Sequence, residues 1–180
     1  MEDQELIQLA LDAGFTHAAV MDAAKIQPLP EVRDMCAVNT CHRYGACWSC
    51  PPACGTLEEC KERLSQYRSG LVVQVVGELE DSFDVEGLQE LEKRQKEAFS
   101  KLLPQLREKM DHLLPLGTGS CTICKECTYP DAPCRFPEKA VSSMEAYGLL
   151  VNQVCTDSGL RYNYGPNTMA YTGCFLFGKR

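Results

Sequence analysis

The sequence lacks the signatures of the common enzyme and membrane classes. It contains no glycine-rich phosphate loop, no dinucleotide-binding fingerprint, no His-Glu-x-x-His zinc motif and no nucleophile elbow. The C-x3-C-x2-C spacing of radical-SAM enzymes is also absent. No apolar run approaches the ~18 residues of a membrane span, so we expect no membrane association. Any chemistry must therefore come from other residues.

Positive charge and histidine are scarce. The chain has 18 Lys and Arg against 25 Asp and Glu, a net charge of −7, so we expect no nucleic acid partner, because phosphate backbones require a basic surface. Its 3 histidines show no ligand spacing. The N-terminal stretch MEDQELIQLALDAG has no basic region and no apolar core, which predicts a protein without a signal peptide, in the cytoplasm.

Cysteine, by contrast, is abundant. Ten of the 12 cysteines fall into two clusters: Cys36-x4-Cys41-x5-Cys47-x2-Cys50-Pro-Pro-x-Cys54-x5-Cys60 and Cys121-x2-Cys124-x2-Cys127-x6-Cys134. A chain of 180 residues with 44% hydrophobic content can bury a core and has little need of disulfides. Dense clusters of reduced thiols in a cytoplasmic protein therefore indicate a metal site.

The second cluster points to iron and sulfide. Three cysteines at x2 spacing with a fourth a few residues later nearly reproduce the ferredoxin arrangement for a [4Fe-4S] cluster. We predict Cys121, Cys124, Cys127 and Cys134 as ligands. In two-cluster ferredoxins the fourth cysteine ligates the other cluster, so Cys134 can serve either site. Zinc is the alternative metal, although zinc sites usually pair two C-x2-C knuckles.

The first cluster holds more thiols than one four-ligand site needs. We predict Cys36, Cys41 and Cys50 as ligands, with Cys60 or Cys54 as the fourth. Cys47 is the expected spare, beside Trp48, whose ring is placed to pack over the metal. Another possibility for the remaining thiols is that they are small buried hydrophobic residues. The isolated Cys155 and Cys174 are expected in the core.

The order of elements predicts an α/β fold. Hydrophobic periodicity indicates helices over residues 2–13, 56–67, 85–110 and 142–155, and strands over 16–21, 71–79, 113–117 and 169–177. Ser142-x-x-Glu145 resembles a capping box, and Pro104 is expected to kink or split the third helix. Such alternation predicts one domain, residues 1–180, built on a small, mostly parallel (mixed) sheet of about four strands flanked by helices. Both cysteine loops follow strands, so parallel strands would place them at one end of the sheet.

The paired motifs resemble a known family. Cys41-His-Arg-Tyr44-Gly45-x-x-Trp48-Ser-Cys50-Pro51-Pro52, taken with the second cluster and its continuation Arg135-x-Pro137, is similar to the predicted metal-binding proteins of domain-of-unknown-function family 2284. The resemblance implies an iron–sulfur or other metal site in an anaerobe-type cytosolic protein, and no particular reaction. The recurrent cysteines of the family match Cys36, Cys41, Cys50, Cys121, Cys124, Cys127 and Cys134. Cys47 is extra, and Cys54 and Cys60 belong to some members only.

Three functions remain open at this point. The first is an iron–sulfur protein with two [4Fe-4S] clusters that passes single electrons to a redox partner, for which the acidic surface suits a basic docking patch. The second is an iron–sulfur enzyme with an open iron site for a small substrate. The third is an interaction module stabilised by zinc.

Overall fold

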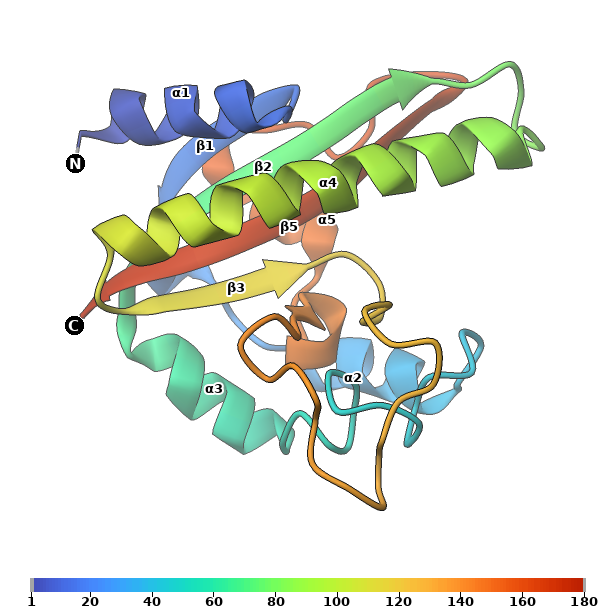
Figure 1. Ribbon diagram of the computed structural model, residues 1–180. Helices are drawn as coiled ribbons and strands as arrows, with labels where there is room; N and C mark the ends of the chain where they lie inside the picture. Colours follow the sequence, from blue (N-terminus) through green and yellow to red (C-terminus); the bar gives the residue numbers. More distant parts are fainter. Residues whose placement is uncertain (1, 180) are drawn as a thin grey trace.

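The computed structural model describes residues 2–179 and shows an α/β arrangement, as predicted (Figure 1). Long helices and strands fill the part nearest the two termini, and the cysteine loops project from the opposite part. No helix within residues 2–179 is long and apolar enough to cross a lipid bilayer. The elements in chain order are α1 (Asp3–Ala13), β1 (His17–Asp22), η1 (Ala23–Lys25), α2 (Pro30–Ala37), α3 (Leu57–Ser65), β2 (Tyr67–Glu78), α4 (Val85–Lys109), β3 (Leu113–Gly117), β4 (Ser142–Ser143), η2 (Glu145–Tyr147), α5 (Val151–Ser158) and β5 (Thr168–Lys179).

The sheet is mixed, but it is mostly antiparallel rather than mostly parallel. Its strand order is β1-β2-β5-β3-β4, five strands in the described residues instead of about four. Only β3 and β4 run parallel there, and the long central strands β2 and β5 pair antiparallel from Tyr67 to Glu78. The prediction rested on the alternation of helices and strands along the chain. Such alternation indicates a sheet covered by helices, but it does not fix the strand direction.

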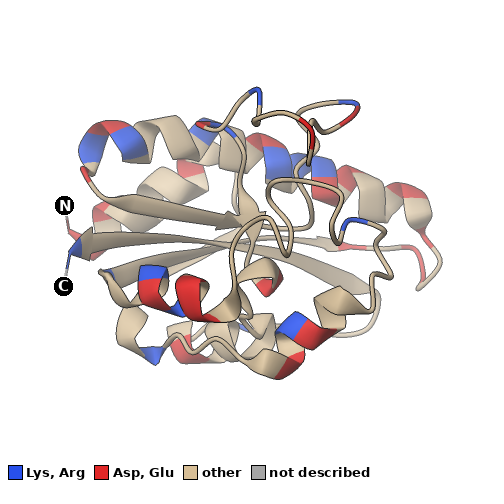
Figure 2. Ribbon diagram, turned by 90° about the horizontal axis from the view of Figure 1, so that it is seen from below, with Lys and Arg blue, Asp and Glu red and all other residues tan. Residues whose placement is uncertain are grey.

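Two hydrophobic cores lie on the two faces of the sheet. Leu71, Val73 and Phe175 pack against α1 and α4 on one face. Alternate residues of the same strands, Val72 and Cys174, join the second core with residues of α3, η2 and α5. Figure 2 shows the sheet edge-on between these helical layers. Cys174 and Cys155 are both 0% exposed, so the prediction that they belong to the core is confirmed.

The route by which the cysteine loops meet differs from the predicted one. β1 and β3 run in opposite directions, because three antiparallel pairings separate them. The end of β1 therefore lies level with the start of β3, and the first loop must run back beneath the sheet. It does so through residues 26–29: the Leu29 N–H donates to the Gly148 carbonyl at 2.8 Å, and the Met144 N–H donates to the Gly117 carbonyl at 3.3 Å.

Several boundaries were predicted well, and others were not. Thr56 and Glu59 form the capping box that opens α3, and β3 has the predicted limits. The helix predicted at Ser142 is wrong: Ser142–Ser143 pairs with β3, the Ser143 hydroxyl accepts the Ala146 N–H, and α5 begins only at Val151. α2 was missed within a proline-rich loop, because Pro30 opens that helix instead of interrupting it. α4 continues unbroken through Pro104.

Gly148 gives a test of how tightly the chain is packed where the first cysteine loop begins and ends, at Leu29 and Leu57. Its φ is +76°, and a Cβ there would lie 2.6 Å from the Leu57 Cδ1 and 3.2 Å from the Leu29 carbonyl oxygen. Gly159 has a similar φ of +80° but nothing within 4 Å, so it is a matched control. We expect Gly159→Ala to lower the free energy of unfolding by about 1 kcal/mol through the left-handed backbone alone. Gly148→Ala should cost about 1–3 kcal/mol more through overpacking, measured by urea denaturation, and equal losses would contradict this account.

Candidate metal centre

The first cysteine loop is anchored on the backbone of η2. The Cys36 Sγ lies 3.8 Å from the Glu145 carbonyl oxygen, and the Cys54 Sγ lies 3.6 Å from that of Ala146. The half-buried Arg33 of α2 donates to the carbonyls of Ala146 and Gly55 and lies 3.6 Å from the Cys60 Sγ. One guanidinium group therefore holds three segments of the chain around these thiols.

Cys36, Cys41, Cys47 and Cys50 form a chain of neighbouring thiols. Burial, followed by the nearby Glu145 carboxylate, raises the pKa of Cys36, and the proximity of Cys41 raises it further. The hydrogen bond between Cys50 and Cys47 raises the pKa of Cys50 and lowers that of Cys47 to about 5. The Ser49 hydroxyl, 3.4 Å from the Cys47 Sγ, also favours the Cys47 thiolate.

Cys54 and Cys60 make a separate buried pair. Cys60 is 0% exposed and Cys54 is 7% exposed. A hydrogen bond from Cys54 is the main cause that lowers the pKa of Cys60 to about 6, and the Arg33 guanidinium adds to it against the effect of burial. The pKa of Cys54 is raised in turn. The structure thus places both candidates for the fourth ligand side by side, and the choice between them stays a prediction.

The second cysteine loop wraps a small cavity. All four of its predicted ligands line this cavity, whose free space is about 20 Å³, together with Cys47 from the first loop; the four are Cys121, Cys124, Cys127 and Cys134. The loop is closed by hydrogen bonds from the Thr128 hydroxyl to the Pro133 carbonyl at 2.9 Å and from Arg135 to the Glu126 carbonyl at 2.9 Å. Burial raises the pKa of Cys121, and the neighbouring Cys47 and Cys134 raise it further.

Ser49 and Trp48 join the two loops. The Cys121 N–H donates to the Ser49 hydroxyl at 3.2 Å. The Trp48 indole N–H donates to the Ala132 carbonyl at 3.1 Å, and its ring packs edge-to-face with the Tyr129 ring, with 4.9 Å between the ring centroids. These contacts put thiols from both loops on one surface, although the loops are some seventy residues apart in the sequence.

The sequence did not indicate that Cys47 lies beside the second cysteine loop. Its x2 spacing to Cys50 suggested one shared site with a spare thiol. In the structure the two side chains stay in contact, but Cys47 is 2% exposed and also lines the cavity of the second loop. Cys47 therefore lies between the two groups of thiols.

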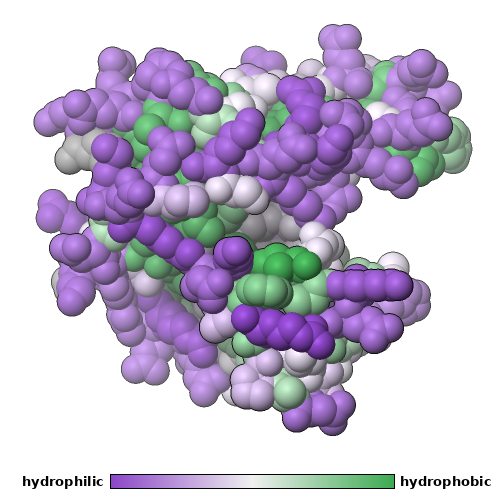
Figure 3. All heavy atoms as spheres, in the orientation of Figure 1, coloured by the Kyte–Doolittle hydropathy of each residue, from purple (hydrophilic) through white to green (hydrophobic). Residues whose placement is uncertain are grey.

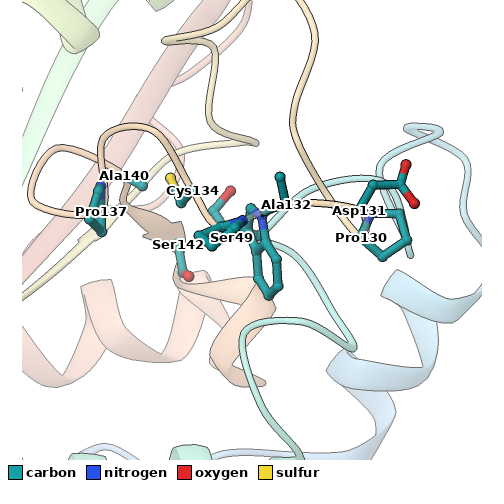
Figure 4. A pocket seen from close by; sticks show the side chains of 10 residues that line it. Ser49, Pro130, Asp131, Ala132, Cys134, Pro137, Ala140 and Ser142 are labelled. Atoms are coloured by element: carbon teal, nitrogen blue, oxygen red, sulfur yellow. The ribbon is translucent and has the colours of Figure 1, made fainter.

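Beside this cavity a wider hollow of about 500 Å³ reaches Cys134 (Figure 4). The figure shows Cys134 between Ser49 on one side and Pro137 and Ala140 on the other, with Ser142 nearby. The exposed Asp131 and the half-buried Cys134 both line this hollow, so Cys134 is within reach of solvent.

The donor atoms suit a soft metal. Thiolates are the ligands that iron–sulfur clusters, zinc and Cu(I) share. Within residues 2–179 no three His, Cys, Asp or Glu side chains converge closely enough to hold a single ion. The residues fit a thiolate-bound group by their chemistry, and the loop must adjust around it.

Ser49 gives a test of the junction between the loops. Ser49→Ala removes the acceptor of the Cys121 N–H, and we expect a loss of about 1–3 kcal/mol in the free energy of unfolding. Ser65, which is exposed and bonds only the Glu62 carbonyl within its own helix, is the control. Ser65→Ala should change stability by less than about 0.5 kcal/mol. Urea denaturation of the metal-free protein measures both losses. An equal effect of the two changes would contradict the role of Ser49 in joining the two loops.

Comparison with known proteins agrees with the chemistry of these loops. No curated protein and no solved structure matches the chain. One family model, described as predicted metal-binding protein, matches residues 19–177 and so includes both cysteine loops. The resemblance inferred from the cysteine motifs is thereby confirmed. The chain belongs to the predicted metal-binding proteins of domain-of-unknown-function family 2284.

Proposed function

We propose that the protein binds two [4Fe-4S] clusters and passes single electrons to a partner protein. Cys121, Cys124, Cys127 and Cys134 would hold one cluster. Cys36, Cys41 and Cys50 would hold the other, with Cys60 or Cys54 as its fourth ligand. The observation that carries the proposal is that all four cysteines of the C-x2-C-x2-C-x6-C motif line one cavity. Bound clusters of this kind take up and release one electron each.

The neighbourhood of the two thiol groups supports this role. Cys47 lines the second cavity and is hydrogen-bonded to Cys50 of the first cysteine loop, so the two clusters would be neighbours. Trp48 and Phe136 add apolar cover to the second cavity, while Cys41 of the first group is exposed. Burial and solvent exposure are among the factors that set the potentials of such clusters.

A redox partner is expected to dock by charge. The net charge of −7 favours a partner with a basic patch, and transient electron carriers use small, electrostatically steered interfaces. All 12 cysteines are free in the structure, which suits the reducing cytoplasm in which we place the protein.

The small size of the second cavity favours one other candidate, an interaction module stabilised by zinc. About 20 Å³ of free space holds roughly one water molecule, which is nearer to the size of a single ion than to that of a cluster, although the loop must still bring the thiols together around it. Four thiolates are a common ligand set of structural zinc. The two candidates differ in colour, in metal and in the presence of sulfide.

Metal analysis separates them. Protein purified without oxygen should contain about eight iron and about eight sulfide per chain, with visible absorbance that dithionite bleaches. Cys127→Ser should reduce the iron to about four per chain, because one cluster loses a ligand. Cys155→Ser, a change in the core, should leave the iron content unchanged. A colourless protein with stoichiometric zinc would establish the zinc module instead.

Trp48 provides an independent optical test. It is the single tryptophan of the chain and lines the second cavity. Reconstitution with iron and sulfide should quench its fluorescence strongly, because the cluster absorbs where the indole emits, whereas zinc has no such absorption. In the double variant Trp48→Phe, Phe83→Trp the reporter moves to the exposed β2–α4 loop, away from the cysteine loops in Figure 1. Quenching should then be weaker, and equal quenching in both proteins would argue against a cluster at this cavity.

A further inference from the structure

A groove of about 680 Å³ lies between α4 and the second cysteine loop. In Figure 3 the surface is deeply hollowed between the upper part of the molecule, which includes α4, and the lower part with the cysteine loops, and hydrophobic residues are visible on the lower lip. The groove is separate from the metal cavity, although Cys121 belongs to the walls of both. Its volume is that of a typical site for a small molecule.

The walls of the groove are mainly apolar. Phe99 and Leu103 of α4 form one wall, and Ile123 and Val141 from the chain around the second cysteine loop contribute to the other. Ile123 is 44% exposed, which is unusual for a side chain of this size. An apolar body of a ligand would cover these side chains.

At the floor of the groove lies a polar group without a partner. Gln95 lines the groove but is only 1% exposed, and its Nε2 has no hydrogen-bond partner among the described residues. Buried amide N–H groups are nearly always paired, because an unpaired one costs free energy. A carbonyl oxygen of a ligand at the floor would accept this hydrogen bond.

The charge of the groove is opposite to that of the chain. Lys96, Arg107 and Lys139 line it together with the carboxylate of Glu138, although the whole chain carries −7. Lys96 is paired with the Glu92 carboxylate at 2.5 Å, which leaves Arg107 and Lys139 as the excess positive charge. Arg107 donates to the Glu138 backbone carbonyl, and the Lys139 ammonium lies 5.7 Å from the centre of the Phe136 ring. Neither Arg107 nor Lys139 is neutralised by a salt bridge in the part of the chain that the structure describes. Both are therefore available to an anion.

We propose that this groove binds a small linear organic acid that carries a second carbonyl group. Its carboxylate would lie at Arg107 and Lys139, and its carbonyl oxygen would accept from the Gln95 Nε2. Gln95 and Arg107 are twelve residues apart on α4, so their backbones are separated by a rise of roughly 18 Å. The long arginine side chain makes the distance from its guanidinium to the Gln95 amide shorter than this rise. An extended chain of about eight carbons suits the remaining distance. This inference rests on the groove alone and does not depend on which metal the cysteines hold.

Calorimetry with 7-oxooctanoate, octanoate and octylamine tests the proposal on the full-length protein purified without oxygen, with its metal content measured in the same sample. We expect 7-oxooctanoate to bind with a Kd of about 0.1–1 mM, and octanoate about tenfold more weakly because it lacks the carbonyl. Octylamine, which carries the opposite charge, should not bind. Equal affinity for the two acids, or binding of octylamine as tight as that of 7-oxooctanoate, would overturn the proposal.

Variants identify the groups involved. Gln95→Met should abolish the preference for 7-oxooctanoate over octanoate, while stability to urea stays equal or rises, because the lost group is an unpaired donor. Arg107→Gln and Lys139→Gln should each weaken both acids about tenfold. Lys93→Gln, at an exposed position of α4 outside the groove, is the matched control and should change affinity less than about twofold. An unchanged preference in Gln95→Met, or equal effects of Lys93→Gln and Lys139→Gln, would contradict the assignment.

Discussion

The arrangement of the two cysteine loops depends on the backbone of residues 144–148. On one side the Met144 N–H is bonded to the end of β3, from which the second cysteine loop starts. On the other side the carbonyls of Ala146 and Gly148 accept from Arg33 and from Leu29 of the first loop. Because β1 and β3 are antiparallel, nothing in the sheet itself would bring the loops together. A short stretch of irregular chain does so through its own polar groups.

The charges near the thiols also follow from this arrangement. The hydrogen bond from Cys54 and the Arg33 guanidinium stabilise the Cys60 thiolate, and the hydrogen bond from Cys50 stabilises that of Cys47. Thiols must lose their protons to bind a metal, so these two are already suited to binding. The pKa values of Cys36, Cys50, Cys54 and Cys121 are raised, so those thiols would release their protons only when the metal binds. In the groove beside the second loop, lysine and arginine side chains bring positive charge to an otherwise acidic chain.

Much of the fold could be predicted from local patterns. The helix start at Thr56, the strand Leu113–Gly117 and the core cysteines Cys155 and Cys174 were predicted correctly, because capping, β propensity and burial are properties of short segments. The helix predicted at Ser142 failed because pairing with β3 took the place of a capping box whose sequence was suitable. The predicted strand direction was wrong for a related reason, since apolar strands with helices between them along the chain are compatible with either direction.

The sequence by itself determined the thiol chemistry: the number and spacing of the thiols predict a metal-binding protein, and the family match agrees with this. Which thiols are neighbours was decided by the tertiary structure alone. Cys47 joins the second cavity, and Cys54 pairs with Cys60, through contacts with Ser49 and Arg33 that no spacing rule contains. The same holds for the groove at Gln95, whose walls come from a helix and a loop that meet only when the sheet has formed. Spacing along a chain fixes local reach, whereas contacts between distant segments depend on the packing of the whole domain.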